Sequence, residues 1–356
     1  MDAQYRVRFA GTLSDQLIGD FPFEGTSFEA RIGAAGAMSG NIPIARGDST
    51  FGARVAAIHG SAATTAYVYR NGVPWWGGPV WTKTLASDEN GHPTINISAA
   101  TFESYLDRVL LATDLPALPG TDQMDIARSF INHMQSDPHA NVGLTCDTIQ
   151  SGIIRDRVLY AAASRPSYLK MLSDLAALDQ GFEFVTQVLT DPTTGARMRR
   201  LRLGYPILSS GVTHRISRPG AILSYSFPED GTRAATSLMA TGSGANSSVH
   251  TNAGAYAAGY PRTDLTTSYS SITDIATLEA HATADLALVA PPFGVPAVRV
   301  RLDATDITPQ CLGDSVRISI VDELFPAGVT ATYRLVGMTV APEERGRYET
   351  CDLILN

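Results

Sequence analysis

The spacing of apolar residues changes twice along this chain of 356 residues, and that change restricts the fold more than any single motif does. Up to about residue 98, apolar and polar residues alternate, as at Tyr5, Val7 and Phe9, which is typical of half-buried strands. The middle of the chain has apolar residues at helical spacing, and the last third alternates again. The sequence therefore predicts a mainly β protein with an α+β middle.

The first third predicts a β-barrel over residues 1–108. Its strongest local signal is Asn71–Gly72, because both residues tolerate the positive φ angles of a two-residue hairpin turn. Ile95 and Ile97 alternate with polar neighbours in a further strand. Many short strands separated by glycine and proline favour a barrel or a sandwich.

The middle of the chain predicts a small α+β domain over residues 109–215. One helix begins after Asp122, whose side chain suits the N-cap position. A second helix begins near Ser164, with Pro166 in its first turn and Gly181 as the left-handed residue after its end. A hairpin then follows, with the strands Phe182–Leu189 and Met198–Leu203.

The last third, residues 216–356, predicts a second β-barrel that is interrupted by an arm and a helix over about residues 242–292. Ser224–Ala240 is expected to be extended. Gly242–Gly259 is so rich in Gly, Ser, Asn and Ala that it predicts a long loop or a mobile arm.

After this arm, Ile275 to Leu286 keeps helical spacing behind Thr273 or Asp274 as the cap, and Pro291–Pro292 ends the helix. Alternation then returns and predicts the strands of the second barrel. These strands contain Val298 to Leu302, Val316 to Ile320, Tyr333 to Val340 and Cys351 to Leu355.

Composition and charge exclude several function classes. The net charge of −8 argues against specific nucleic-acid binding, which depends on a clustered basic surface. We expect no membrane segment and no signal peptide, since apolar runs are short and the first residues lack the layout of a leader. Cys146, Cys311 and Cys351 lack metal-type spacing and are expected to be small buried residues in a reducing cytosol.

Motifs for nucleophilic catalysis, phosphate binding and metal binding are absent from the sequence. The string Gly242–Asn246 comes nearest to a nucleophile elbow, but its spacing and context do not fit, so a flexible loop is the simpler interpretation. His133 and His139 lie near each other, but an Asp-Pro pair between them breaks the helix that could have aligned them as ligands.

Two pairs of carboxylates have the residue types that glycoside hydrolysis requires. They are Asp303 with Asp306 and Glu343 with Glu344. The surrounding sequence predicts exposed positions for both pairs, and hence no raised pKa for a general acid. We therefore expect a protein that is not an enzyme, with no cofactor and no metal site.

Two groups of side chains are candidates for an interface. The first surrounds Gly77–Pro79, where alternate tryptophans can fill a core while another is exposed for a subunit contact or a sugar, and we expect at least two of the three in the core. The second is an arginine cluster from Arg197 to Arg202, of which only two members share the face opposite Leu201. The candidate interface residues are Trp75, Trp76, Trp81, Arg200 and Arg202.

Four stretches match the motifs of one known family in order and spacing. They are Val68–Trp81, Tyr105–Arg108, Leu172–Phe184 and Leu312–Ile318. The first contains a strand that ends in Arg-x-Gly and a return strand with Trp-x-Gly-x-Val. In these stretches the chain resembles the minor tail proteins, or tail hub (baseplate hub) proteins, of long-tailed actinobacteriophages.

The resemblance implies a structural virion protein, made in the host cytoplasm and located at the distal end of the tail. It implies a homotrimeric ring with two barrels per chain, which would match a six-fold tail-tube ring. The implied partners are the distal tail or tail-tube ring protein, the tape measure protein and the tail-tip or receptor-binding proteins. The resemblance supplies no catalytic residue.

Two alternatives from other classes remain open at this stage. A carbohydrate-binding or receptor-binding module of the tail tip would use Trp75 or Trp81, exposed on a shallow groove. A cell-wall hydrolase would require a converging pair of acids or a metal cluster.

Overall fold

The chain consists of two compact units in the computed structural model. The first unit contains Met1–Ser224 and Val298–Asn356, and the second contains Tyr225–Ala297. The structure describes residues 3–44, 52, 55–87, 89, 91, 93–229, 231–232, 234–243, 246–269, 272–290, 296–343 and 348–356. None of the helices in these ranges combines the length and the hydropathy that a membrane span needs.

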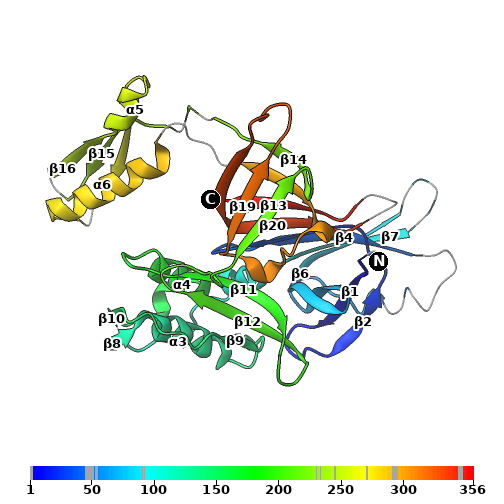
Figure 1. Ribbon diagram of the computed structural model, residues 1–356. Coiled ribbons are helices and arrows are strands. Elements are labelled where there is room, and N and C mark those ends of the chain that lie inside the picture. Colours follow the sequence, from blue (N-terminus) through cyan, green and yellow to red (C-terminus); the bar gives the residue numbers. More distant parts are fainter. Residues whose placement is uncertain are drawn as a thin grey trace. The chain divides into compact units, whose positions relative to one another are not determined.

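One 13-stranded sheet dominates the structure (Figure 1). Its strands from the start of the chain are β1 (Tyr5–Gly11), β2 (Leu17–Phe21), β3 (Glu24–Arg31), β4 (Ala37–Pro43), β5 (Thr64–Arg70), β6 (Val73–Ser87) and β7 (Pro93–Ala100). Its later strands are β13 (Thr213–Arg218), β14 (Ile222–Ser226), β18 (Ala297–Arg301), β19 (Ser315–Ile320), β20 (Val329–Ala341) and β21 (Thr350–Leu355). The order is β14-β18-β21-β20-β3-β4-β7-β6-β5-β1-β2, with β19 also paired to β20 and β13 to β19.

The predicted fold class is confirmed in part. The protein is mainly β with an α+β middle, and the sheet is antiparallel apart from pairs such as β13 with β19. The two expected barrels are not found: among the described residues, the strands form a continuous sheet and no closed barrel. The reason is that β3 bonds to β20, so the first and last parts of the chain share one sheet.

The predicted hairpin turn is confirmed, with φ of 51° at Asn71 and 82° at Gly72. After the turn, β6 pairs first with β5 and then, from Val80 onward, with β7. Gly78 lies where the partner changes, and a Cβ there would be 1.9 Å from the backbone oxygen of Ala100. A glycine is therefore required for the backbone to pass this closely.

The middle of the chain contains helices and short strands, as predicted. They are α2 (Phe102–Arg108), β8 (Leu118–Asp122), α3 (Gln123–Gln135), β9 (Leu144–Cys146), β10 (Ile154–Arg157), α4 (Tyr168–Ala176), β11 (Glu183–Thr190) and β12 (Arg197–Gly204). Asp122 caps α3 by accepting a hydrogen bond from Met124 N at 2.8 Å, which confirms the predicted N-cap. The predicted hairpin is β11–β12, and β9 pairs in parallel with β12.

Two details of the second helix differ from the prediction. Helix α4 begins at Tyr168 rather than near Ser164, because Arg165 between them has a left-handed φ of 43°. The left-handed residue after the helix is Gln180, with φ of 53°, and not Gly181. A Cβ on Gly181 would instead lie 1.8 Å from a backbone oxygen of α4, so this glycine serves a close approach.

The α+β middle shares one hydrophobic core with the first strands of the sheet. Tyr67 and Tyr69 of β5 belong to the same buried cluster as Phe130 of α3, Leu172 of α4 and Phe184 of β11. Figure 1 shows α3 and α4 close to β11 and β12. Because the core is continuous, these parts of the first unit cannot separate without exposing buried apolar surface.

The second unit is a small α/β fold of its own. It contains β15 (Ser237–Thr241), β16 (Ser247–Thr251), α5 (Ala253–Ala257), β17 (Asp264–Ser268) and α6 (Ile275–Val289), with strand order β16-β15-β17. Leu278 and Ala282 of α6 pack against Leu238 of β15. Asp274 caps α6 by accepting from Thr277 N at 2.8 Å, as predicted.

The expectation of a loop or mobile arm at Gly242–Gly259 is wrong over most of its length. Residues of this segment form β16 and α5, because β16 pairs with β15 over its whole length and Asn252 caps α5. Gly244 and Ala245, which belong to the string considered as a nucleophile elbow, lie outside the described residues. The predicted helix stop at Pro291–Pro292 also lies outside them.

Candidate functional site

Two of the three tryptophans lie in the core, and the third is half-buried. Trp75 and Trp76 are 7% and 2% exposed, which confirms the prediction that at least two of them are in the core. Trp76 Nε1 donates to a backbone carbonyl of β3 at 2.8 Å, and half-buried Trp81 donates to Ser104 Oγ at 2.8 Å. The guanidinium of Arg70 lies 4.7 Å from the ring centre of Trp75. Trp75 and Trp76 are therefore part of the core, and Trp81 is half-buried.

The arginines of β12 divide between two faces, as the strand pattern predicts. Arg200 pairs with Asp147, and Arg202 donates to the backbone oxygen of Gln310 at 3.0 Å. Both are half-buried, with 38% of the Arg200 side chain exposed. The structure thus gives each of these two candidate interface residues a partner within its own chain.

The other face of β12 contains a buried ionic cluster that joins the hairpin to the first strands. Arg199, whose side chain is 4% exposed, donates to Tyr67 OH at 2.6 Å and to Asp15 Oδ1 at 2.8 Å. Arg197 donates to the same Asp15 oxygen at 2.6 Å and to Tyr69 OH at 2.9 Å. Burial raises the pKa of Tyr67 above its usual range, so its hydroxyl stays neutral and can donate to Asp15 at 2.7 Å.

A second buried cluster joins the two ends of the chain. Glu349, just before β21, accepts from Arg70 through both carboxylate oxygens, at 2.6 and 2.8 Å. Tyr5 of β1 donates to the same carboxylate. Burial, and then the hydrogen bond to Glu349, raise the pKa of Tyr5. The side chain of Glu349 is 3% exposed, so this is a desolvated pair with two-pronged geometry.

A third ion pair links the hairpin to the last strands. Arg334 of β20 pairs with Glu183 at the start of β11, with a distance of 2.7 Å from Nη1 to Oε1. The other oxygen of Glu183 accepts from the backbone of Leu208 at 2.8 Å. The three clusters together tie the β12 hairpin, the first strands and the last strands into one body.

The carboxylates considered as a catalytic pair do not face each other. Asp303 is held by Arg301 at 2.7 and 2.8 Å, and Asp306 lies instead 2.9 Å from His214 Nδ1. Hydrogen bonding to Arg301 lowers the pKa of Asp303, which is the opposite of what a general acid requires. Of the second pair, Glu343 is exposed and Glu344 lies outside the described residues.

The two histidines considered as metal ligands lie in different surroundings. His133 Nδ1 lies 2.7 Å from Tyr168 OH, while His139 is exposed beyond the end of α3. Burial lowers the pKa of His133, so its imidazole is neutral and hydrogen-bonded. Of the cysteines, Cys351 is buried as predicted, whereas Cys146 and Cys311 are half-buried.

A different group of potential ligands does converge. His214, Cys311 and Asp314 place one donor atom each within 4.8 Å of one another. His214 and Asp314 are 5% and 2% exposed. Sequence analysis missed this group because His214 is far from the other two residues along the chain. The parallel pairing of β13 and β19 brings them together.

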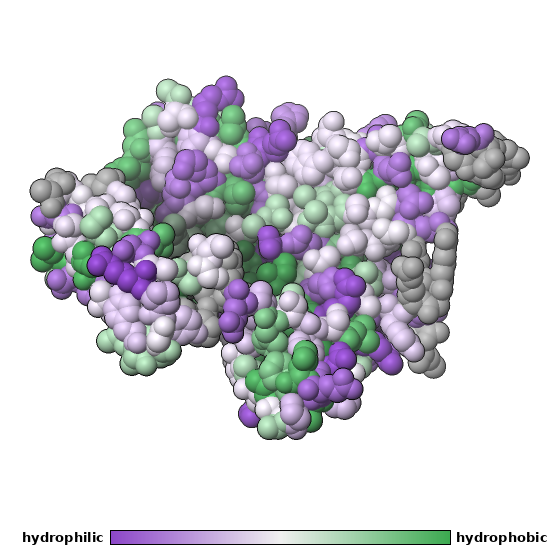
Figure 2. All heavy atoms as spheres, turned by 90° about the horizontal axis from the view of Figure 1, so that it is seen from above, coloured by the Kyte–Doolittle hydropathy of each residue, from purple (hydrophilic) through white to green (hydrophobic). Residues whose placement is uncertain are grey.

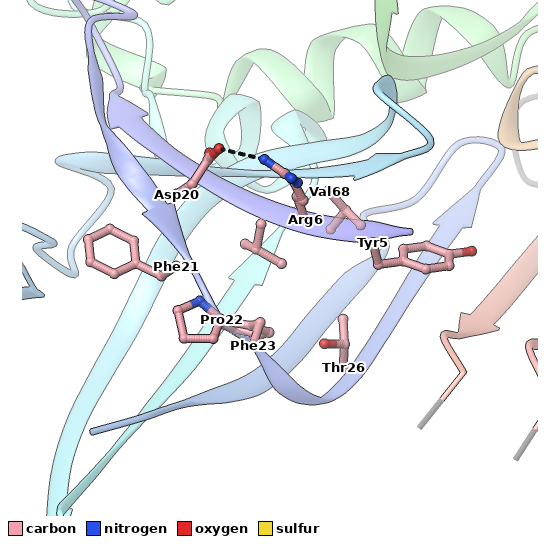
Figure 3. Close-up of a pocket in the computed structure, with 9 residues that line it drawn as sticks. Tyr5, Arg6, Asp20, Phe21, Pro22, Phe23, Thr26 and Val68 are labelled. Carbon is pink, nitrogen blue, oxygen red and sulfur yellow. Dashed lines mark ion pairs between the residues drawn. The ribbon is translucent and has the colours of Figure 1, made fainter. Parts of the chain in front are cut away.

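An open cavity of about 240 Å³ lies against β1 and the turn between β2 and β3. Figure 3 shows Phe21, Pro22 and Phe23 along one side of it, with Arg6 and Asp20 joined by an ion pair at 4.0 Å. Its lining is mainly apolar and its charged groups are already paired. The cavity therefore offers no set of converging reactive groups.

Apolar side chains are also exposed on the α+β middle. Val158 is 71% exposed and Leu178 is 48% exposed, and both line a depression of about 190 Å³ with Arg155. On the face drawn in Figure 2, hydrophobic and hydrophilic residues are mixed. An apolar depression with a charged rim has the composition of a protein contact rather than of an active site.

Neither a protein-family model nor a curated protein matches the sequence. The fold, however, is similar over almost the whole chain to three solved structures. A tail protein from Neisseria meningitidis has a TM-score of 0.59 at 13% identity, covering 99% of this chain and 96% of the other. The 43 kDa tail protein of prophage MuSo2 from Shewanella oneidensis has a TM-score of 0.65 at 11% identity, covering 99% and 100%. The chain shares its fold with phage tail proteins.

A third similar structure is prophage tail protein gp18 from Listeria monocytogenes, with a TM-score of 0.54 at 12% identity and coverage of 99% and 94%. Identities this low establish the fold alone. The expectation of a tail-protein fold, which came from four short sequence motifs, is therefore confirmed.

Proposed function

We propose that this chain is a structural protein of a phage tail and that it forms the distal tail hub. The observation that supports this most is the similarity of nearly the entire fold to prophage tail proteins, with no large part of either chain left over. Similarity confined to one domain would have been compatible with an enzyme fused to a tail module. Similarity over both chains favours a protein whose whole fold serves the tail.

The ionic clusters support a mechanical role. They lie at the junctions between the first strands, the hairpin and the last strands, and they connect residues as far apart as Tyr5 and Glu349. Buried pairs of this kind fix relative orientation more than they add stability. A ring subunit that transmits force along a tail needs such fixed orientation, whereas a hydrolase needs converging acids, which Asp303 and Asp306 do not provide.

The proposed assembly is a homotrimer that joins the six-fold tail tube to the tail tip. Three copies of the chain would match a six-fold tube ring if each copy contacts two neighbouring subunits of that ring. The proposed partners are the tail-tube or distal tail ring, the tape measure protein and the tail-tip or receptor-binding proteins. We also propose, from the sequence pattern, a division of the chain into three parts at residues 108 and 215.

We place a subunit contact at the apolar depression of Val158 and Leu178, and keep Arg200 and Arg202 as polar candidates beside the hairpin. Val158 is exposed to 71%, so burying its side chain on assembly would be favourable by about 1–2 kcal/mol. The aromatic candidates Trp75, Trp76 and Trp81 contribute only indirectly in this proposal, because they are already packed.

Light scattering combined with size-exclusion chromatography tests the assembly. We expect a mass three times the 37.9 kDa of one chain, either for the purified protein or after addition of the neighbouring tail-tube ring. Val158→Asp should weaken the trimer, while Leu324→Asp, at a side chain of similar exposure (76%), should not. A strict monomer under both conditions would contradict the proposed hub.

A further inference from the structure

His214 lies between two carboxylates. Its Nδ1 is 2.9 Å from Asp306 Oδ2, at an angle that does not make a hydrogen bond, and its Nε2 is 3.4 Å from Asp314 Oδ2. A neutral imidazole has only one N–H, so it cannot donate to both carboxylates. In a neutral ring, one of the two nitrogens therefore directs its lone pair at a carboxylate. This arrangement is unfavourable unless a cation lies between the two groups.

The distance on the Nε2 side is informative. At 3.4 Å it is at the long limit for a hydrogen bond between nitrogen and oxygen. Two ligand atoms that each lie about 2.0–2.1 Å from a tetrahedral zinc ion are about 3.3–3.4 Å apart. The separation of His214 Nε2 and Asp314 Oδ2 is therefore that of two zinc ligands.

Cys311 supplies a third donor. Its Sγ lies within 4.8 Å of the other two donor atoms, and Thr308 N–H donates to it with a nitrogen-to-sulfur distance of 3.4 Å. A sulfur and a nitrogen bound to the same zinc ion are about 3.6 Å apart, so the half-buried Cys311 side chain would need to move by no more than about 1 Å.

Local structure fixes the positions of these residues. The 3₁₀ turn η3 (Pro309–Cys311) and the following Gly313, with φ of 95°, place Cys311 and Asp314 on one side of the loop. A Cβ on Gly313 would lie 2.0 Å from the backbone oxygen of Leu208, so the loop passes close to the segment that leads into β13. His214 is the second residue of β13 and faces inward.

Asp314 is suited to be an anionic ligand. Its Oδ1 accepts from the backbone N–H of Ser210 and lies 3.2 Å from Ser209 Oγ, so donors from the segment before β13 hold the carboxylate in place. Each of its oxygens has two lone pairs, so Oδ2 can accept from Ser210 Oγ at 2.7 Å and still bind an ion.

We propose that His214, Cys311 and Asp314 bind one divalent transition-metal ion, with zinc as the best fit. A thiolate, an imidazole and a carboxylate are ligands that zinc accepts together, and water would complete the tetrahedron. A thiolate and a carboxylate neutralise the two charges of the ion, which matters at a buried site. Asp306 lies on the Nδ1 side of the ring, where the carboxylate behind a zinc-bound histidine usually accepts from its N–H, and a change of angle would be needed to form that hydrogen bond.

The ion would have a structural effect. It would connect the start of β13, the loop before β19 and the turn η3, all of which lie in the first unit. The proposal does not depend on the tail function, because it rests on the geometry of three side chains. The competing interpretation is an imidazolium held by two carboxylates with no metal, and the experiments below distinguish the two.

Metal content is the first test. The full chain is dialysed against zinc, freed of excess ion and measured by mass spectrometry of the elements. We expect one zinc per chain, and a loss of most of it in His214→Ala and in Cys311→Ser. Cys146→Ser is the matched control, since that half-buried thiol lies on β9 outside the group, and it should keep the ion.

Cobalt(II) gives a second readout that does not depend on stability. Replacing zinc by cobalt should produce the charge-transfer absorption of a cobalt–thiolate bond, and Cys311→Ser should abolish it while Cys146→Ser leaves it intact. Wild-type protein that holds no zinc and shows no such absorption would overturn the proposal. Equal zinc content in wild type, His214→Ala and Cys311→Ser would overturn it as well.

Discussion

Replacing Arg199 by Met tests whether the buried cluster holds the hairpin to the first strands. The Met side chain fills a similar volume but removes every donor. Arg199 donates to Tyr67 OH, to Asp15 and to the backbone oxygens of Thr12 and Val142, and its side chain is 4% exposed. The substitution therefore leaves two buried carbonyls without this donor, together with a carboxylate that keeps only part of its partners.

The magnitude follows from these losses. An unsatisfied buried acceptor costs about 1–3 kcal/mol, and breaking a buried ion pair by removing one partner costs about 3–5 kcal/mol. Asp15 is 37% exposed and keeps Arg197, so the electrostatic loss is at the lower end. We expect the free energy of unfolding to fall by about 3–5 kcal/mol in Arg199→Met.

Tryptophan fluorescence during denaturant unfolding is the appropriate assay, because all 3 tryptophans of the chain lie on β6 in the first unit. The signal is thus insensitive to the second unit, which need not unfold at the same denaturant concentration. Arg200→Met is the matched control: its side chain is 38% exposed on the other face of the strand, and about 1 kcal/mol or less is expected. Equal midpoints for the two variants would refute the argument.

Three further substitutions test other parts of the structure. Gly78→Ala should lower the free energy of unfolding by about 1–3 kcal/mol, since its Cβ would meet the backbone oxygen of Ala100 at 1.9 Å. The control Gly52→Ala, where a Cβ has open space, should have little effect, and similar fluorescence midpoints for the two variants would contradict the prediction. Asp122→Asn should make stability depend less on pH on the acid side, because backbone hydrogen bonds outweigh burial and lower the pKa of Asp122. The stabilisation from this carboxylate is complete above the ordinary pKa of about 4 and is lost as pH falls through the lower pKa of the folded state. An unchanged dependence of stability on acid pH would argue against it. Trp75→Ala should cost about 3–5 kcal/mol because the ring is buried; a variant of undiminished stability that loses glycan binding in a glycan array would instead support receptor recognition.

Local patterns predicted the elements that depend on local chemistry. The turn at Asn71–Gly72 and the caps at Asp122 and Asp274 were predictable because each rests on the conformational preference or hydrogen bonding of one or two residues. The strand-rich order and the β11–β12 hairpin followed from alternation in the same way. Boundaries that depend on neighbours were less accurate, as at Ser164.

Features that depend on distant residues were not predictable from the same patterns. Nothing near Glu349 indicates that its partners are Tyr5 and Arg70, and a buried Arg199 cannot be told from its exposed neighbours except by its alternation with Arg200. The pairing of β3 with β20, which replaces two barrels by a continuous sheet, is also non-local. The loop predicted from the composition of Gly242–Gly259 was wrong over most of the segment, because small polar residues there pair within a sheet.

The interface candidates show the same limit. Trp75 and Trp81 are of a residue type that is common at binding surfaces. Their burial depends on contacts with Arg70 and α2 and on the close backbone approach at Gly78. The metal-ligand group at His214 was missed because its members come together only through the parallel pairing of β13 and β19. Sequence spacing detects ligands within one element more readily than ligands brought together by a sheet.

The position of the chain in the particle tests the central claim most directly. Electron microscopy of the parent phage with gold-labelled antibody against this chain measures that position. We predict label at the distal end of the tail, where the tube meets the tip. Label on the head, or distributed along the tail tube, would contradict the proposed hub.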